Sequence, residues 1–166
     1  SGKLPTTFPI CLEDTPAYDS YPGENLQMDY KEGLLVGYRW YEKKKKTPLF
    51  PFGHGLSYTE FNYENLVIED IKSHDLKCSL NISNIGYMDG YEIIQCYVSY
   101  LDNDQNEPVK TLQAFDKVLI KKGETSKVDF ILNYRNFSFW NTELKKWDVK
   151  KGNYRLLIGS SSEQIH

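Results

Sequence analysis

The chain has 166 residues, with 20 Lys and Arg against 23 Asp and Glu, and so carries a net charge of −3. This length allows one domain with a tail and excludes a complete (β/α)₈ barrel, which needs about 200 residues or more. The weak negative charge and the lack of any run of about 18 apolar residues argue against nucleic-acid binding and against a membrane span. Aromatic residues make up 14% of the chain, and such residues favour strands and interfaces.

The first third of the chain is predicted to be an extended arm. Six of the seven prolines lie within the first 51 residues, and proline interrupts helices and inner strands. Residues 1 to about 57 are nevertheless rich in aromatic side chains, which a disordered linker lacks. We therefore expect the arm to lie along a surface and to bury these rings there: Tyr30, Tyr38, Trp40, Tyr41, Phe50 and Phe52.

From residue 58 onward the pattern is that of strands separated by turns. Residues 76–82 alternate apolar and polar side chains, which is the period of a half-buried strand. About seven short strands and no amphipathic helix predict an all-β, immunoglobulin-like antiparallel β-sandwich, and the missing Cys…Trp…Cys spacing favours the fibronectin type III-like variety. The predicted strands are 61–69, 76–82, 91–101, 109–120, 128–132, 137–140 and 154–158.

Residues that could carry chemistry are few. His54, His74 and His166 lie far apart without metal-ligand spacing, and no nucleotide-binding motif is present, so we expect no metal and no cofactor. The number of cysteines is odd, and Cys78 and Cys96 fall on apolar strand faces. This placement favours buried free thiols over a disulfide between the two.

His54 stands between Gly53 and Gly55. A turn residue that is hydrogen-bonded to the backbone is favoured here over an imidazole that faces a ligand. Two sequons, at Asn81 and Asn136, allow N-glycosylation if the chain passes through a eukaryotic secretory route.

Three surface features each allow two interpretations. Asp102–Asp104 with Glu107 favour a solvated loop over a calcium site, because the remaining ligands of an EF-hand are missing. Lys43–Lys46 favour an exposed turn over a site for an anionic partner. Tyr91 and Tyr97 are expected on an outward strand face, where a covered interface is favoured over stacking on sugar rings.

Two motifs in the arm carry a family resemblance: KEGLLVGYRWY at 31–41 and PLFPFGHGLSYTEF at 48–61. They strongly resemble the C-terminal part of family 3 glycoside hydrolases, the β-glucosidase and β-xylosidase family. Further segments are similar to the family in order and spacing, at 2–9, 92–99, 108–115 and 152–162. The departures are small, with Cys96 in place of a usual Leu, Ala114 in place of a common Gly, and His54 where Tyr is also common.

The resemblance implies three parts. Residues 1–9 resemble the last strand of the family's α/β sandwich domain, residues 10–57 its linker arm, and residues 58–166 its fibronectin type III-like domain. Family members hydrolyse β-glycosides with retention, using two carboxyl groups about 5 to 5.5 Å apart. One carboxyl group lies in a catalytic barrel that this chain lacks, and residues 1–9 contain no Asp or Glu for the other. We therefore assign no catalytic residue to this chain.

The resemblance implies a non-catalytic fragment that stabilises the catalytic barrel and α/β domains of a parent enzyme acting on β-linked glucosides. Gly53, Gly55 and Tyr58 are expected at the corner where the arm enters the sandwich, with glycine allowing a positive φ and Tyr58 packing its ring and bonding its hydroxyl. His54 and Tyr97 are expected at the same junction between domains. An extracellular or periplasmic location is favoured over a cytoplasmic one. The alternative is a carbohydrate- or surface-binding module, which would need Tyr91 and Tyr97 in a flat, exposed row.

Overall fold

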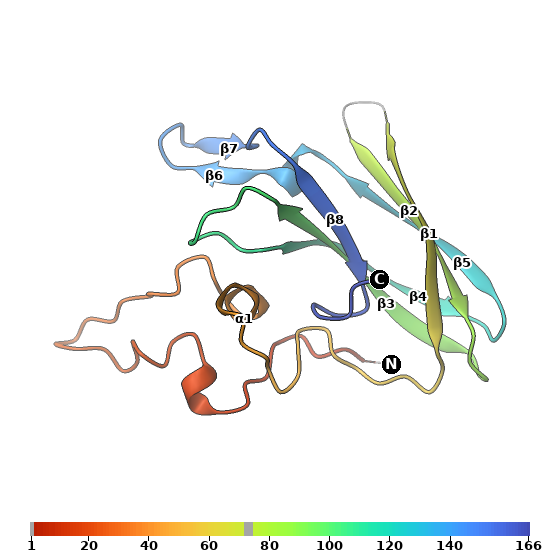
Figure 1. The fold of residues 1–166 in the computed structure, drawn as a ribbon, viewed down its shortest axis with the longest axis horizontal. Helices are drawn as coiled ribbons and strands as arrows, with labels where there is room; N and C mark the ends of the chain where they lie inside the picture. Colours follow the sequence, from red (N-terminus) through yellow and green to blue (C-terminus); the bar gives the residue numbers. More distant parts are fainter. Residues whose placement is uncertain (1, 72–74) are drawn as a thin grey trace.

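The computed structural model describes residues 2–71 and 75–166. Within these ranges an irregular arm is followed by a β-sandwich (Figure 1). The arm contains a 3₁₀ turn, η1 (Leu12–Asp14), and a short helix, α1 (Tyr38–Lys44). The strands are β1 (Phe61–Asp70), β2 (Leu76–Asn84), β3 (Gly90–Tyr100), β4 (Thr111–Ile120), β5 (Thr125–Leu132), β6 (Phe139–Asn141), β7 (Lys146–Asp148) and β8 (Tyr154–Gly159), with a 3₁₀ turn, η3 (Tyr134–Phe137), before β6.

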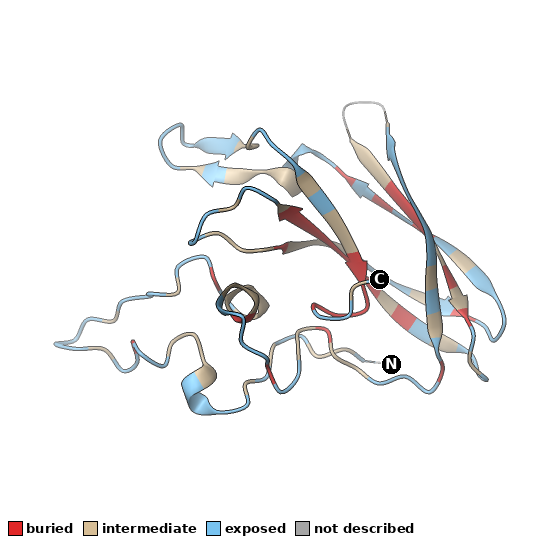
Figure 2. Cartoon of the chain, viewed as in Figure 1, coloured by how far each residue is buried: buried red, intermediate tan, exposed pale blue. Residues whose placement is uncertain are grey.

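Two antiparallel sheets form the sandwich, with strand orders β1-β2-β5 and β4-β3-β8, and β6 and β7 make a separate hairpin. The prediction of an all-β, antiparallel sandwich is thus confirmed. The core lies between the two sheets and consists of the inward side chains of every second strand residue. Figure 2 marks the buried residues of these strands in red. Its fully or nearly fully buried members include Cys78, Leu80, Ile82, Ile94, Cys96, Ile120, Phe130, Leu132 and Ile158.

Cys78 on β2 and Cys96 on β3 are fully buried free thiols, as the favoured interpretation predicted. They belong to the two facing sheets, so their side chains meet in the core. The pKa of the Cys96 thiol is strongly raised by its hydrogen bond with Cys78 and by burial. Both thiols therefore act as small apolar core residues.

No amphipathic helix was predicted, and the structure contains one short helix in the arm. α1 has only seven residues, which is too short for an apolar period to show in the sequence and too short for a stable isolated helix. Lys43 and Lys44 occupy its last turn and Lys45 ends it in the left-handed conformation. The lysine run thus lies largely at the C-terminal end of a helix, where the free carbonyl groups favour positively charged side chains.

The start of the arm pairs with its end. The Leu4 amide donates to the His54 carbonyl at 2.8 Å and the Gly53 amide donates to the Leu4 carbonyl at 2.8 Å. Phe8 and Phe50 form an isolated antiparallel bridge. Residues 2–8 therefore form an irregular two-stranded ribbon with residues 50–54, and the intervening segment is a folded loop.

The segment after β5 also differs from the prediction. Where one strand at 137–140 was expected, η3 ends at Phe137 and β6 begins at Phe139. The Asn133 and Asn136 side chains form a reciprocal cap that closes this turn. β7 was not predicted, because three residues with two charged side chains carry no strand pattern. In the described part of the chain, no helix has the length and apolar character needed to cross a membrane.

Candidate functional site at the junction of arm and sheet

Tyr97 forms the centre of the junction between the arm and the sandwich. Its β3 neighbours Cys96 and Val98 face the core, so Tyr97 points to the outside of the β4-β3-β8 sheet, yet it is fully buried. The Tyr38 ring of α1 meets it edge-on, with centroids 5.8 Å apart, and Phe52 stacks on Tyr38 at 5.2 Å. Tyr97 thus lies under the arm, which agrees with the interface interpretation and contradicts an exposed row of Tyr91 and Tyr97.

Gln95 and Gly53 form the polar part of this contact. The Tyr97 hydroxyl donates to Oε1 of Gln95 at 2.5 Å, and Gln95 lies directly beneath Gly53. Gly53 has a φ of +83°, and a Cβ at this position would lie 2.5 Å from Nε2 of Gln95. Glycine is therefore required at residue 53, as predicted, both because of the positive φ and because a Cβ would meet Gln95. Burial is the main cause that raises the pKa of Tyr97, so its hydroxyl remains a donor.

Lys110 ties α1 and the C-terminal segment to the sheet. Its ammonium group pairs with the Glu42 carboxylate, donates to the Ser162 carbonyl at 2.6 Å and lies 5.3 Å from the centre of the Tyr97 ring. The Lys110 side chain is only 6% exposed and that of Glu42 is 24% exposed. Burial raises the pKa of Glu42, and this effect outweighs the opposing hydrogen bond from Lys110.

Backbone groups complete the junction. The Tyr38 hydroxyl accepts a hydrogen bond from the Leu112 amide at 2.8 Å, next to an irregularity in the β3–β4 ladder between Cys96 and Tyr97. The Ser162 amide donates to the Phe52 carbonyl at 2.8 Å. Together these contacts join the arm, the edge strand β4 and the segment after β8.

A second anchor lies near the start of the chain. Lys3 forms an ion pair with Glu92 of β3 at 3.3 Å, and the Tyr63 hydroxyl donates to the same carboxylate at 3.0 Å. The ring of His166 stacks on Tyr63 with centroids 4.1 Å apart, and burial lowers the pKa of His166. Sequence reasoning missed this anchor, because an isolated lysine and an isolated glutamate carry no motif.

The arm is also held by the acidic loop that follows β3. Lys43 donates to Oδ1 of Asn103 at 2.7 Å and to the Asp104 carbonyl at 2.5 Å, while Glu107 pairs with Lys150. The loop is therefore a docking point for lysines and not simply solvated. Among the described residues, no group of three or more His, Cys, Asp or Glu could hold a metal ion.

The corner between arm and sandwich is built differently from the prediction. Tyr58 was expected to pack its ring there, but it is 94% exposed. The neighbouring Thr59 takes that place, donating its hydroxyl to Oδ1 of the buried Asn84 at 2.6 Å. Gly55 was expected to have a positive φ, but it is required for a close approach instead, since a Cβ there would lie 2.5 Å from the Gly2 carbonyl oxygen.

The remaining predicted residues have defined places. The His54 amide donates to the Pro51 carbonyl at 3.0 Å, and its ring packs 4.9 Å from Phe50, as suits a turn residue. Asn136 caps η3 with its own side chain, so a glycan there would break the cap, whereas Asn81 lies half-buried within β2. His74 lies outside the described residues.

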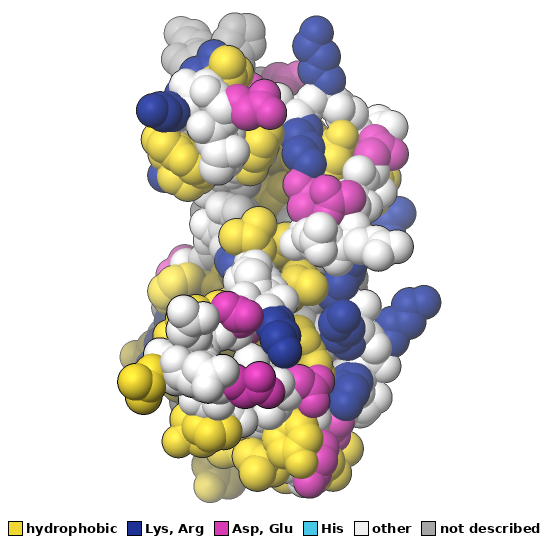
Figure 3. Space-filling model, turned by 90° about the vertical axis from the view of Figure 1, so that its left-hand side faces the viewer, with side chains coloured by type: hydrophobic (Ala, Val, Ile, Leu, Met, Phe, Trp, Pro, Cys, Tyr) yellow, Lys and Arg dark blue, Asp and Glu magenta, His cyan; other side chains and the backbone are white. Residues whose placement is uncertain are grey.

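The arm exposes many large apolar side chains. Figure 3 shows hydrophobic side chains gathered over the lower end of the molecule, where Figure 1 places the arm. Monomeric proteins rarely expose such an extended apolar surface. The exposed large side chains of the arm are Phe8, Ile10, Leu12, Tyr18, Tyr21, Leu26, Tyr30, Leu34, Val36, Leu49, Phe50, Leu56 and Tyr58.

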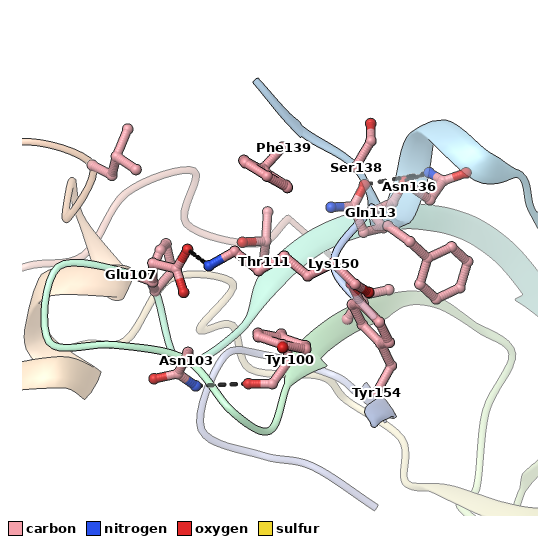
Figure 4. A pocket seen from close by; sticks show the side chains of 14 residues that line it. Tyr100, Asn103, Glu107, Thr111, Gln113, Asn136, Ser138, Phe139, Lys150 and Tyr154 are labelled. Carbon is pink, nitrogen blue, oxygen red and sulfur yellow. Dashed lines mark hydrogen bonds and ion pairs between the residues drawn. The ribbon is translucent and has the colours of Figure 1, made fainter. Parts of the chain in front are cut away.

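A small cavity of about 150 Å³ lies between the loop after β3, β6 and the arm residue Leu34 (Figure 4). Tyr100, Phe139 and Tyr154 supply aromatic walls, and the ion pair of Glu107 and Lys150 crosses it. The Tyr154 hydroxyl donates to the Lys150 carbonyl at 2.8 Å and that of Tyr100 donates to the Lys151 carbonyl at 3.1 Å. These polar groups satisfy one another, so the cluster is explained by its own packing.

Comparison with known proteins shows what the chain is similar to. Residues 92–162 match the model of a fibronectin type III-like domain. The chain is 44% identical over 168 residues to thermostable β-glucosidase B of Acetivibrio thermocellus and 41% identical over 167 residues to probable β-glucosidase K of Emericella nidulans. Both alignments cover 99% of this chain, and they cover 22% and 19% of these two relatives.

A solved structure agrees over the same span. The crystal structure of the family 3 β-glucosidase of Bifidobacterium adolescentis superposes with a TM-score of 0.93 at 34% identity, covering 99% of this chain and 24% of that one. The chain thus spans about a fifth to a quarter of the length of these relatives. In sequence and in fold, it corresponds to the C-terminal region of family 3 glycoside hydrolases of the β-glucosidase type, with a fibronectin type III-like domain.

Proposed function

We propose that this region is a clamp that stabilises the catalytic part of a β-glucosidase. In this proposal, residues 1–9 close an α/β domain, residues 10–57 link it to the sandwich, and the parent enzyme cleaves β-linked glucosides. The observation that carries the proposal is the two-sided arm. Its inner side is fixed to β3 and β4 through Tyr38, Phe52 and Lys110, while many of its other large apolar side chains are exposed.

The carboxylates of the junction support a structural role. Glu42 is paired with Lys110 and Glu92 with Lys3, so both serve to hold segments together. Retaining hydrolysis needs one carboxyl group that acts as nucleophile and one that exchanges protons. The carboxylates of this junction are already committed to ion pairs, and we assign the chemistry to the catalytic domains of the parent enzyme.

The test is made in the full-length enzyme, with p-nitrophenyl β-glucoside as substrate. One variant ends before residue 59, and a second carries Tyr97→Ala to release the arm, with Ile131→Ala as its matched control on the other sheet. The proposal predicts a lower Tm and a shorter activity half-life for the first two, with KM little changed in the active fraction. Wild-type stability and activity in the truncated enzyme would contradict it.

A carbohydrate-binding role is the second candidate, and one observation favours it. Trp140 and Trp147 form a cross-strand pair on the β6–β7 hairpin, with centroids 5.5 Å apart and side chains 48% and 41% exposed. Exposed indole rings can stack on sugars. This role predicts that Trp147→Ala abolishes retention on insoluble cellulose without affecting hydrolysis of the soluble substrate.

A further inference from the structure

The outer faces of the two sheets differ in chemistry. On the β1-β2-β5 sheet, the outward residues of β2 and β5 are polar apart from Ile131, and on β1 Val67 is an outward apolar residue opposite Ser79. The outward polar residues of β2 and β5 include Lys77, Ser79, Asn81, Ser83, Lys127 and Asp129. On the β4-β3-β8 sheet, the outward residues of β3 and β4 beyond the arm are mostly apolar. An antiparallel sheet with one solvated face normally alternates apolar and polar side chains, so the second sheet departs from the usual pattern.

The uncovered apolar residues form one patch. Tyr91 lies opposite Leu119 and Phe115 lies opposite Gln95, so all of these side chains share the outer face. Ile93 lies between them, opposite Lys117. Tyr91 is 44% exposed, Phe115 is 68% exposed and Leu119 is 45% exposed. We call Tyr91, Ile93, Phe115 and Leu119 the β3–β4 patch.

The patch begins where the arm ends. Gln95, the cross-strand partner of Phe115, is the residue covered by Gly53. The arm and the β3–β4 patch therefore form one continuous surface, with the arm covering the Tyr97 end of β3 and leaving the Tyr91 end open.

The rim of the patch is positively charged. The ammonium group of Lys117 lies 4.9 Å from the centre of the Tyr91 ring, and that of Lys122 lies 5.8 Å from the ring of Tyr87. Tyr87 is 89% exposed in the turn before β3. A surface of this kind fits a partner with an apolar centre and carboxylates at its edge.

We propose that the β3–β4 patch is the docking surface for the portion of the same polypeptide that lies outside these residues in the full-length enzyme. The proposal rests on the proposed function and names the sandwich surface that it uses. The arm is covalently joined to both sides and is fixed beside the patch, so the other domains are held at a high effective concentration there. A second copy of the chain has no such advantage.

Hydroxyl-radical footprinting of the full-length enzyme tests the proposal without disturbing it. Phe115 and Ile131 are both exposed in this region alone, at 68% and 62%, and lie on opposite faces of the molecule. Relative to the unfolded enzyme, we expect Phe115 and Tyr91 to be protected about tenfold more than Ile131, as expected for side chains at a buried interface core. Equal labelling of Phe115 and Ile131 would overturn the proposal.

Matched variants then separate the possible causes. Phe115→Ser should lower the Tm of the full-length enzyme by about 5 °C, and Ile131→Ser should leave it nearly unchanged. Light scattering and footprinting across a dilution series test whether a second copy of the enzyme covers the patch. Protection of the patch that is lost when a dimer dissociates would assign the patch to self-association and overturn the proposal. If Phe115 is labelled while truncation before residue 59 still destabilises the enzyme, the docking surface is wrong and the clamp function stands.

Discussion

Replacing Lys110 by Met removes the charge at the centre of the arm junction while keeping an apolar stem of similar length. The change leaves the half-buried Glu42 carboxylate without its cation and the Ser162 carbonyl without its donor. Breaking a buried ion pair from one side typically destabilises a protein by about 3–5 kcal/mol. Because the Glu42 side chain keeps 24% exposure, we expect the lower end, a loss of about 3 kcal/mol in the free energy of unfolding.

The second change, Glu42→Gln in the Lys110→Met background, distinguishes charge from packing. The amide carries no charge that needs compensation, so the double variant should recover about half of the lost stability. A double variant that is as unstable as Lys110→Met would show that the lost Ser162 bond and ring contact, and not the uncompensated carboxylate, cause the effect.

The pH dependence has a defined sign. The pKa of Glu42 is raised in the folded state, mainly by burial, so the folded chain holds this proton more tightly than the unfolded chain does. The resulting stability is present at low pH and is lost as the pH rises through the raised pKa. Without Lys110 the pKa rises further. The destabilisation by Lys110→Met should therefore be smaller at about pH 4 than at about pH 7, and Glu42→Gln should abolish this difference.

Urea unfolding followed by tryptophan fluorescence measures both effects. Trp40 in α1 reports on the arm, while Trp140 and Trp147 report on the β6–β7 hairpin of the sandwich. Far-UV circular dichroism of the native variants controls for a changed fold. A loss below about 1 kcal/mol for Lys110→Met, the range of exposed ion pairs, would refute the argument that this pair is buried and structural.

Two further predictions concern the arm corner and the thiols. Gly53→Ala should destabilise the chain by about 2 kcal/mol, since a methyl group would meet Gln95. Gly123→Ala, at a residue with a φ of +73° and open space around it, should destabilise the chain by only about 1 kcal/mol. Equal urea midpoints for the two variants would contradict the close approach at Gly53. Ellman's reagent should modify only the exposed Cys11 in the native chain, and slowly, because the hydrogen bond to Asp14 raises the pKa of Cys11. In denaturant all three thiols should react. A single reactive thiol in denaturant would indicate a disulfide between Cys78 and Cys96.

The sandwich could be predicted because its strands follow simple rules. Alternation at 76–82 correctly placed Cys78, Leu80 and Ile82 in the core, and the glycine turns placed most strand boundaries within a few residues. Short elements escaped prediction. α1 and β7 are held by contacts with distant residues, such as Lys110 for α1, and seven or three residues show no period of their own, while β6 was predicted with an earlier start, as part of a strand at 137–140.

The junction could be predicted only in part. Alternation along β3 shows that Tyr97 faces away from the core, but it does not show that Tyr38 and Phe52 cover it. The corner shows the same limit, because Tyr58 and Thr59 are adjacent and only the structure tells which side chain turns inward. Gly53 was predictable because a positive φ restricts the residue type itself.

The burial of residues along β3 supports the proposed docking on one face of the sandwich. Residues Ile94–Ser99 are all buried, which requires cover on both sides of the strand. The opposing sheet covers the side of Ile94, and the arm covers the side of Tyr97. At the Tyr91 end the inner side is still covered, but the outer side is open and apolar. The arm therefore covers the outer side of β3 only at the Tyr97 end, and the proposed contact with the rest of the enzyme would cover the Tyr91 end. The arm would then connect two domains in the chain and also form the first part of the interface between them.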